Sequence, residues 1–348
     1  MRQKQKYLVT SDLSVLVRRW AAKNDFHVPG REFFRGIHVA LEDELKRIFE
    51  PRDIEVDFLS WATMKGRLLA LIEAEVNGYP IIALDGVYVE NPDMRFETNR
   101  LQGWQKNRRA WTDLGNGPRP GAGMISTQLE RINNHSALYS LQEKKVVVVD
   151  DGVWTGRTFF ALQELLKEHG IEVVKFLVGL YIKQADCEIK LDAPIIAAEH
   201  GLFSQGEIFE WVCQRDYVPG ISYSGRTIGQ SVDGMNLTGP TSPAEKKFYP
   251  NQPMAGNYGA PYVLPLGDPH SWASIPKEEV KAFSRFCLEL ARKLYDGIER
   301  ETSRVLGYHR PVLVKDLDRP PFFYRHPDWT VLREIETSLN ILESMKVK

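Results

Sequence analysis

The chain has 348 residues, of which 43% are hydrophobic and 26% charged, and its formal net charge is −1. These values predict a soluble globular protein of one large domain or two ordinary ones, and they argue against a general nucleic-acid coat or a membrane-surface protein. No stretch has the apolar length of a signal peptide or a membrane span, so we expect a cytoplasmic protein that makes no membrane contact.

The first third of the chain is predicted to be mainly helical. Residues 13–22, 37–49 and 61–76 place apolar side chains at intervals of three and four, the spacing of an amphipathic helix. The third of these runs ends at Asn77-Gly78, and residues 79–84 follow as a short apolar strand. A helix, a Gly-Tyr-Pro break and a buried strand indicate the entry into an α/β sheet.

A polar, basic and glycine-rich stretch at residues 102–123 is predicted to be a long loop, and such loops often serve as lids or binding segments. Residues 145–149 then form a valine-rich strand, residues 157–168 a helix and residues 173–182 another strand. Strand, turn, helix and strand form a βαβ unit, which predicts a parallel sheet.

Beyond this unit the composition changes twice. Residues 238–269 are rich in Pro, Gly, Asn and Tyr, and two amphipathic helices are predicted at residues 274–299 and 331–345. We therefore divide the chain into four segments. They are an N-terminal helical segment (1–54), an α/β domain (55–220), an irregular insertion or hood (221–272) and a C-terminal helical appendage (273–348).

The chemistry is concentrated in residues 146–158, which read Val-Val-Val-Val-Asp-Asp-Gly-Val-Trp-Thr-Gly-Arg-Thr. The strand ends in two carboxylates, Asp150 and Asp151, at the sheet edge where open α/β folds bind ligands. Residues 155–158 add two hydroxyls, a glycine and the free N–H groups of a helix N-terminus, which suit one phosphate. Two carboxylates would repel a polyphosphate but accept hydrogen bonds from sugar hydroxyls. The pattern therefore predicts a site for a ribose that carries a 5′-phosphate.

This stretch resembles the signature of type I phosphoribosyltransferases, which bind phosphoribosyl pyrophosphate (PRPP). The resemblance implies that Asp150 and Asp151 hold the ribose hydroxyls and that the 5′-phosphate is bound by Trp154, Thr155, Gly156, Arg157 and Thr158. Trp154 stands where the 6-oxopurine enzymes have an acid and is more similar to uracil phosphoribosyltransferases that double as pyrimidine regulators. A plain βα turn with capping residues is the alternative, but the ordered combination favours the motif.

A weaker resemblance concerns the base. Lys183 follows a strand placed like the one whose terminal lysine contacts the base in purine enzymes, and residues 209–217 are similar to the hood strand that stacks an aromatic ring on it. The resemblance implies base contacts from Lys183, Phe209, Trp211 and the backbone of Val212. A surface lysine and a core aromatic strand remain the alternative.

For pyrophosphate, the family uses a loop after the first strand, and the matching residues here are Asp85 and Gly86. The usual Arg-Gly-Gly or Lys-Gly pattern is absent, and a carboxylate would need Mg²⁺ to bridge it to an anion. We expect Mg²⁺ as cofactor, with the ligands Asp150, Asp151 and Asp216. The basic loop would close over pyrophosphate as a lid through four cations: Lys106, Arg108, Arg109 and Arg119. A solvated basic loop is the alternative.

Together these features predict a Mg²⁺-dependent transferase that moves the phosphoribosyl group of PRPP to a nucleobase, purine or pyrimidine, on a phosphoribosyltransferase-like α/β core. Two other classes stay open. One is a non-catalytic PRPP or nucleotide sensor, which the weak pyrophosphate loop favours. The other is an interaction protein or conflict-system effector whose C-terminal helices dock a protein partner. A homodimer is expected from the family alone.

Overall fold

The computed structural model describes residues 4–105, 110–119, 122–135, 144–182, 191–198, 208–221, 225–228, 258–319 and 326–345. The chain separates into two compact units. Unit 1 consists of residues 1–59, 209–228 and 258–348, and unit 2 consists of residues 60–208 and 229–257. This division differs from the four consecutive segments predicted above, because the N-terminal and C-terminal parts of the chain pack into the same unit.

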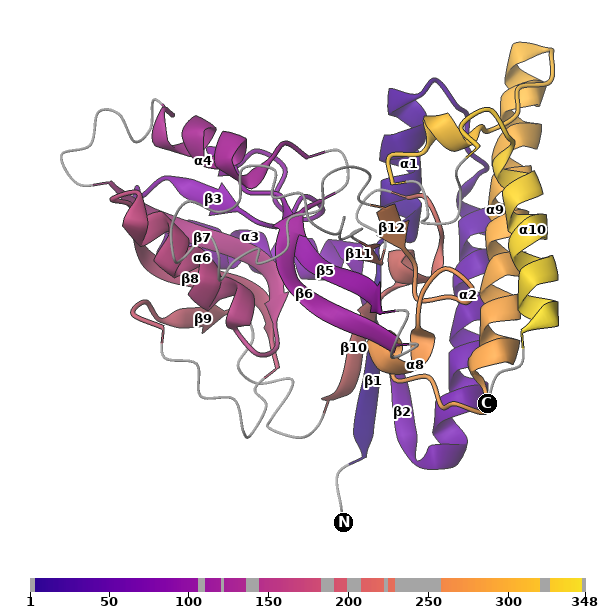
Figure 1. Cartoon of the computed structure of the whole chain (residues 1–348), viewed down its shortest axis with the longest axis horizontal. Helices are drawn as coiled ribbons and strands as arrows, with labels where there is room; N and C mark the ends of the chain where they lie inside the picture. The colour runs from indigo at the N-terminus through magenta and orange to yellow at the C-terminus, as the bar shows by residue number, and fades with distance from the viewer. Residues whose placement is uncertain are drawn as a thin grey trace. The chain divides into compact units, whose positions relative to one another are not determined.

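Unit 2 is built on a parallel sheet of five strands in the order β4-β3-β7-β8-β9 (Figure 1). The strands are β3 (Ile81–Ala83), β4 (Met94–Arg95), β7 (Lys145–Val153), β8 (Glu172–Tyr181) and β9 (Ile195–Ala197). The four valines at the start of β7 are fully buried, as expected for a central parallel strand that is covered on both faces. The predicted α/β class and parallel sheet are confirmed.

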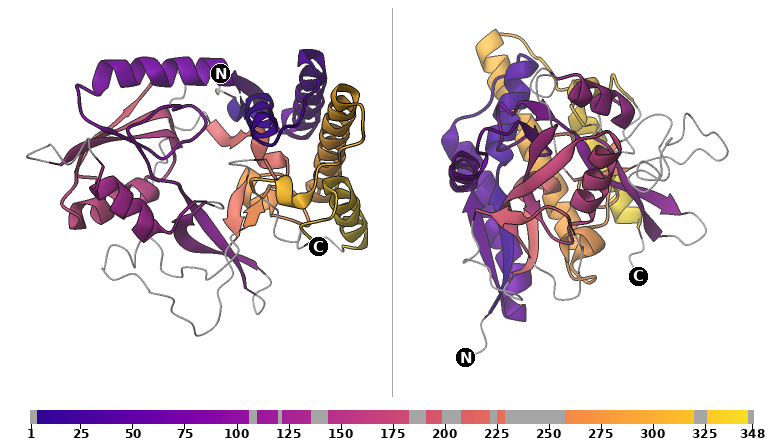
Figure 2. Two further views of the ribbon diagram at one scale, coloured as in Figure 1. Left: turned by 90° about the horizontal axis from the view of Figure 1, so that it is seen from above. Right: turned by 90° about the vertical axis from the view of Figure 1, so that its left-hand side faces the viewer.

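Helices cover both faces of this sheet (Figure 2). On one face, α4 (Ile125–Asn133) and α6 (Arg157–Glu168) join a single core cluster that includes Val146 and Val148. The opposite face is covered by α3 (Trp61–Glu75), which begins at a Ser60 cap whose hydroxyl accepts a hydrogen bond from the N–H of Thr63. This helix lies so close to β8 that a side-chain carbon on Gly179 would meet Met64 and the carbonyl oxygen of Asp151.

The stretch predicted to be a long loop is instead an antiparallel hairpin. It consists of β5 (Thr98–Gln105) and β6 (Ala110–Pro118), with an irregularity in the register between Arg100 and Gln102. The prediction of a loop was wrong because it relied on polar, glycine-rich composition. Antiparallel pairing satisfies backbone groups whatever the side chains, so such a stretch can still form strands.

Unit 1 contains a three-stranded sheet in the order β10-β1-β2 and a set of helices. The strands are β1 (Gln5–Ser11), β2 (Ile54–Ser60) and β10 (Ile208–Cys213), and the longer helices are α1 (Leu13–Lys23), α2 (Arg31–Phe49), α9 (Val280–Leu306) and α10 (Val331–Ser344). The two C-terminal helices lie side by side (Figure 1). The N-terminal segment is not purely helical, because it begins with strand β1, in which Tyr7, Leu8 and Val9 are buried.

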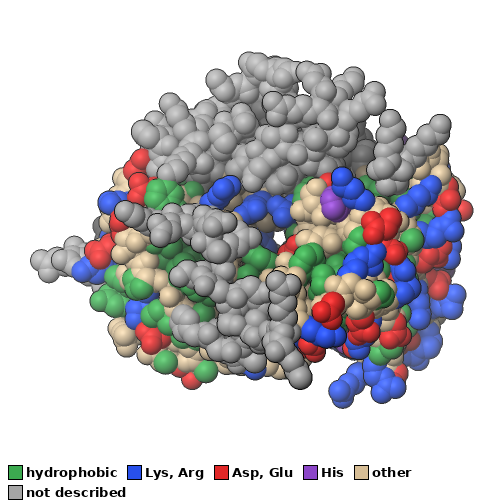
Figure 3. All heavy atoms as spheres, turned by 90° about the horizontal axis from the view of Figure 1, so that it is seen from below, with side chains coloured by type: hydrophobic (Ala, Val, Ile, Leu, Met, Phe, Trp, Pro, Cys, Tyr) green, Lys and Arg blue, Asp and Glu red, His purple; other side chains and the backbone are tan. Residues whose placement is uncertain are grey.

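Smaller elements complete unit 1. They are the antiparallel pair β11 (Arg226–Ile228) and β12 (Tyr258–Ala260), the short helix α8 (Pro269–Ala273) and the 3₁₀ turns Glu50–Arg52, Gln214–Tyr217 and Val314–Asp316. The helix predicted from residue 274 begins at Val280. Within the described residues, no helix is both long and apolar enough to cross a membrane. On the face drawn in Figure 3, basic and acidic side chains are interspersed over the helices at the right of the view.

Candidate functional site

The site begins where β7 leaves the core of unit 2. Val146–Val149 are buried, whereas Asp150 and Asp151 are half-buried at the carboxyl end of the strand. The backbone N–H of Asp151 donates to Oδ1 of Asp150 over 3.0 Å, which fixes the first carboxylate against the turn. The predicted acidic pair therefore lies at the edge of a parallel sheet, where ligands bind in folds of this class.

The turn after this pair leads directly into α6. Gly156 adopts a left-handed conformation (φ 67°) as the N-cap residue, and no described side chain caps the helix. Only glycine takes this conformation without strain. The first N–H groups of α6 have no acceptors within the helix, so the helix N-terminus, with its partial positive charge, can bind an anion. The role of residues 155–158 as a phosphate cradle stays a prediction, and this helix start is compatible with it.

The electrostatics of the acidic pair are unusual. Burial raises the pKa of Asp150 well above its ordinary value, and the neighbouring charges of Asp151 and Asp85 raise it further, while Arg119 and the Asp151 N–H act in the opposite direction. Three acidic side chains are therefore close together at this edge of the sheet, and the charged form of Asp150 is disfavoured. Such a place favours partners that donate hydrogen bonds or carry positive charge, such as sugar hydroxyls or a hard cation.

The loop after β3, predicted to bind pyrophosphate, is organised by Asp85. This buried carboxylate accepts hydrogen bonds from the backbone N–H groups of Val87 (2.9 Å), Tyr88 (2.5 Å) and Val89 (3.1 Å). The Arg95 guanidinium braces the same loop by donating to the carbonyl oxygens of Asp85, Val89 and Glu90. The N–H groups of this loop are thus already paired with an internal anion. The role of Asp85 and Gly86 in pyrophosphate binding stays a prediction.

Three polar side chains from the hairpin and from the residue after it make contacts at this edge of the sheet. Arg119 donates to the carbonyl oxygens of Thr98 (2.8 Å) and Leu84 (3.4 Å), which places one predicted lid cation against the loop after β3. Arg100 Nη2 donates to Thr155 Oγ1 over 3.3 Å, and Thr158 Oγ1 donates to Asn116 Oδ1 over 3.2 Å. Sequence reasoning missed Arg100 and Asn116, because only the hairpin register reveals that they face the cradle. The other lid residues, Lys106, Arg108 and Arg109, lie outside the described residues.

The residues predicted to recognise the base belong to different parts of the chain. Phe209, Trp211 and Val212 are in unit 1, whereas the acidic pair is in unit 2, and Lys183 lies outside the described residues. Within unit 1, the Trp211 indole N–H donates to Thr10 Oγ1 over 2.7 Å, and the Phe209 ring centroid lies 6.1 Å from that of Phe49. Val212 is buried. Their part in base binding stays a prediction.

Asp216, predicted as a third metal ligand, also belongs to unit 1. Its two carboxylate oxygens accept hydrogen bonds from the backbone N–H groups of Cys213 and Gly225, both over 2.9 Å. Burial raises its pKa. Within the described part of the chain, no group of three or more His, Cys, Asp or Glu side chains is arranged to hold a metal ion. The two carboxylates of the acidic pair remain the residues that fit Mg²⁺ by donor chemistry.

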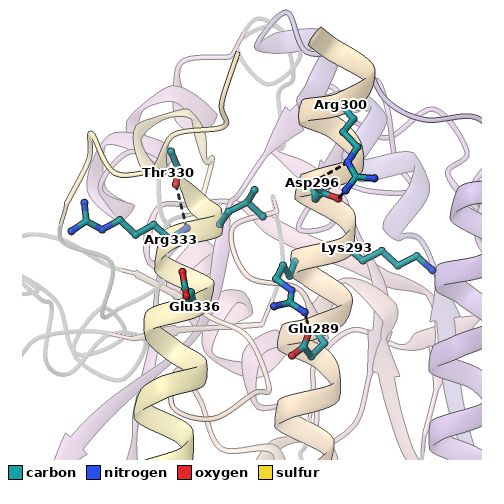
Figure 4. A pocket seen from close by; sticks show the side chains of 9 residues that line it. Glu289, Lys293, Asp296, Arg300, Thr330, Arg333 and Glu336 are labelled. Atoms are coloured by element: carbon teal, nitrogen blue, oxygen red, sulfur yellow. Dashed lines mark hydrogen bonds and ion pairs between the residues drawn. The ribbon is translucent and has the colours of Figure 1, made fainter. Parts of the chain in front are cut away.

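Unit 1 also has a groove of about 870 Å³ between α9 and α10 (Figure 4). Its charged side chains are largely paired along α9, where Arg292 contacts Glu289 and Arg300 contacts Asp296 at 2.7 Å. Pairs at this spacing are usual on a solvated helix face. The groove therefore does not compete with the edge of the unit 2 sheet as a candidate site.

Comparisons with known proteins agree with this geometry. Residues 115–196 match the family model for the phosphoribosyl transferase domain, and they include β7, the acidic pair, the cradle and α6. No curated protein matches the chain significantly. A hypothetical protein from Neisseria gonorrhoeae, solved with bound ppGpp, is 14% identical over 44% of this chain and 81% of its own. The TM-score of this comparison is 0.27. The family match and the strand–turn–helix geometry together show that residues 115–196, within unit 2, are similar to a phosphoribosyl transferase domain.

Proposed function

We propose that unit 2 binds PRPP and transfers its phosphoribosyl group to a nitrogenous base, with release of pyrophosphate and with the help of Mg²⁺. The observation that carries this proposal is the pairing of two carboxylates, Asp150 and Asp151, with an uncapped helix N-terminus that begins at Gly156. The carboxylates suit the two ribose hydroxyls, and the helix N-terminus suits a single phosphate.

The chain's own residues would act mainly by position and charge. With the 5′-phosphate in the cradle and the ribose hydroxyls on the acidic pair, the sugar is held at both ends. Positive charge that develops on the ribose during transfer would be stabilised by the adjacent carboxylates. Bound Mg²⁺, for which Asp150 and Asp151 are the fitting ligands, would supply neutralisation of the leaving pyrophosphate.

A direct experiment incubates the protein with Mg²⁺, PRPP and a panel of purine and pyrimidine bases. We expect pyrophosphate release with one base or one class of bases, and its loss in Asp151→Asn. The matched control is Asp192→Asn, because Asp192 is exposed and pairs with Lys167 at 3.1 Å on the surface of the same unit. If no base and no ribose 5-phosphate compound interacts with the protein, the proposal is wrong.

A second function, a non-catalytic sensor of PRPP or of a nucleotide, is favoured by the loop after β3. Its N–H groups are paired with Asp85, so pyrophosphate would have to displace that carboxylate to bind them. The same assay separates the two functions. Saturable PRPP binding without pyrophosphate release, for every base in the panel, would favour the sensor. Light scattering of the same samples would test the expected homodimer.

A further inference from the structure

The feature that carries a further step is a glycine on the strand next to the acidic pair. Gly179 is buried near the end of β8. In the parallel register Asp150 is opposite Val178, so the next residues of the two strands, Asp151 and Gly179, are beside each other. A glycine inside a buried strand weakens it, and it often marks a place where another part of the chain approaches closely.

The space beside Gly179 is filled from two sides. A Cβ atom at this position would lie 2.7 Å from the Met64 sulfur atom and 2.8 Å from the carbonyl oxygen of Asp151. Cβ atoms essentially never make contacts shorter than 3.0 Å. The Met64 side chain is flexible and can move aside, whereas the Asp151 carbonyl belongs to the backbone. A side chain on Gly179 would therefore displace the backbone of β7 at Asp151, even where Met64 gives way.

Asp151 is also fixed at its other end. Its backbone N–H donates to Oδ1 of Asp150 over 3.0 Å, while its carbonyl oxygen lies against Gly179. A residue that is held at both ends has a defined backbone position. Because its side chain occupies one of a few staggered rotamers, a shift of this backbone is passed on to the carboxylate.

Helix α3 fills the rest of the space over the glycine. Met64 is buried in the first turn of α3, next to β8. The start of this helix is fixed by Ser60, whose hydroxyl accepts the N–H of Thr63 over 3.0 Å. A long, adaptable side chain on the helix thus complements the glycine on the strand, and the close packing is kept.

We propose that Gly179 is a positioning residue for Asp151. By leaving room for the Asp151 carbonyl oxygen, it sets how far the carboxylate extends toward the hydroxyls of the bound sugar. This inference rests on the proposed ribose-phosphate site, and it holds equally for a transferase and a sensor. It separates the two parts of the ligand, because a shift of Asp151 weakens the contact with the sugar and leaves the phosphate at the start of α6 in place.

The test compares the affinities for ribose 5-phosphate and for inorganic phosphate, measured by phosphorus NMR titration at a fixed Mg²⁺ concentration. The wild type is expected to bind ribose 5-phosphate about tenfold or more tightly than phosphate, because hydrogen bonds to a carboxylate are strong. Gly179→Ala is expected to lose most of this preference through an affinity for ribose 5-phosphate that is about tenfold lower, with the phosphate affinity unchanged. A merely structural role would change both affinities together or neither.

Two further variants separate the position of Asp151 from packing. Met64→Ala leaves a cavity, so it should lower the melting temperature and keep the wild-type preference for ribose 5-phosphate. In Gly179→Ala/Met64→Ala the added methyl group occupies part of the space of Met64, so the melting temperature should not fall below that of Met64→Ala. The preference should still be lost, because the clash with the Asp151 carbonyl oxygen remains.

The matched control is Gly66→Ala, because Gly66 is exposed on α3 and a Cβ atom there would meet nothing within 4 Å. It should change neither affinity. If the wild type prefers ribose 5-phosphate and both variants with alanine at position 179 keep that preference, the positioning role is overturned and the proposed site stands. If the wild type binds neither ligand, or binds both equally well, the proposed ribose-phosphate site fails, and the inference fails with it.

Discussion

Two loops at the same edge of the unit 2 sheet use similar residues in opposite ways. Strands β3 and β7 are parallel neighbours, with Ala83 opposite Val149, and an aspartate lies just after the end of β3 and another near the end of β7. After β3, Asp85 accepts three backbone N–H groups of its own loop. At the carboxyl end of β7, Asp150 accepts one, and the N–H groups that start α6 are left without a capping side chain.

The number of hydrogen-bond donors separates a structural carboxylate from one that is available to a ligand. A carboxylate with several N–H donors is stabilised as an anion and holds its loop together. One that has few donors and lies near other acids is costly in its charged form, and the raised pKa of Asp150 expresses that cost. A bound sugar or cation can supply the missing partners.

The largest effect is expected at Asp85. Asp85→Ala would leave the buried N–H groups of Val87, Tyr88 and Val89 without their acceptor, which should lower the free energy of unfolding of unit 2 by about 3–5 kcal/mol. Asp85→Asn keeps one acceptor oxygen, so it should lower the free energy of unfolding by a smaller amount. Urea denaturation measures both, with Asp192→Asn as the surface control. Wild-type stability in Asp85→Ala would show that the loop does not depend on its carboxylate.

An intermediate effect is expected at the glycine that opens the cradle. Gly156 and Gly170 flank α6, and both have a positive φ, 67° and 72°. Alanine at either position should cost about 1–2 kcal/mol of stability, because a side chain disfavours the left-handed conformation. Only Gly156→Ala should also weaken ribose 5-phosphate binding, since Gly170 lies at the far end of the helix. Equal affinities in the two variants would contradict the placement of the phosphate at Gly156.

The comparison also shows what the sequence could reveal. The strand–turn–helix around Asp150 and the C-terminal helix α10 follow from apolar periodicity and from glycine and cap residues, and both were predicted correctly. The start of α6 after Gly156 could be predicted from the residue order, but the absence of a capping side chain could not. The pairing of Asp85 with the N–H groups of its own loop could not be predicted, because the sequence shows an acid but not its donors.

Contacts between segments that are distant in the sequence were even harder to predict. The hairpin β5–β6 has no clear alternation of apolar and polar residues, so its strands and the facing pair Arg100 and Asn116 were missed. The grouping of the chain's two ends in unit 1 depends on contacts such as that of the Trp20 indole N–H with the Asp316 carbonyl oxygen, at 2.8 Å. Local periodicity carries no information on partners at such separations.

The smallest effect is expected at Glu334 of unit 1. This buried carboxylate can be compared with Asp85, which has three N–H donors, and with Asp150, which has one. Glu334 is 3% exposed on the inner face of α10, and its Oε1 accepts no hydrogen bond from the described residues. Burial raises its pKa, against the smaller opposing effects of His326 and Arg333. The folded protein therefore retains a proton at pH values where the unfolded chain has released it.

Because the folded-state pKa is the higher one, stability should fall as the pH rises from about 4, where unfolded glutamate ionises, through the folded-state pKa. Glu334→Gln removes the ionisation, so it should match the wild type near pH 4 and be about 1 kcal/mol more stable at pH 7. Denaturation at pH 4, 5.5 and 7 measures the difference. A variant that is less stable than the wild type at pH 7 would mean that the ionised carboxylate has donors after all, as Asp85 does.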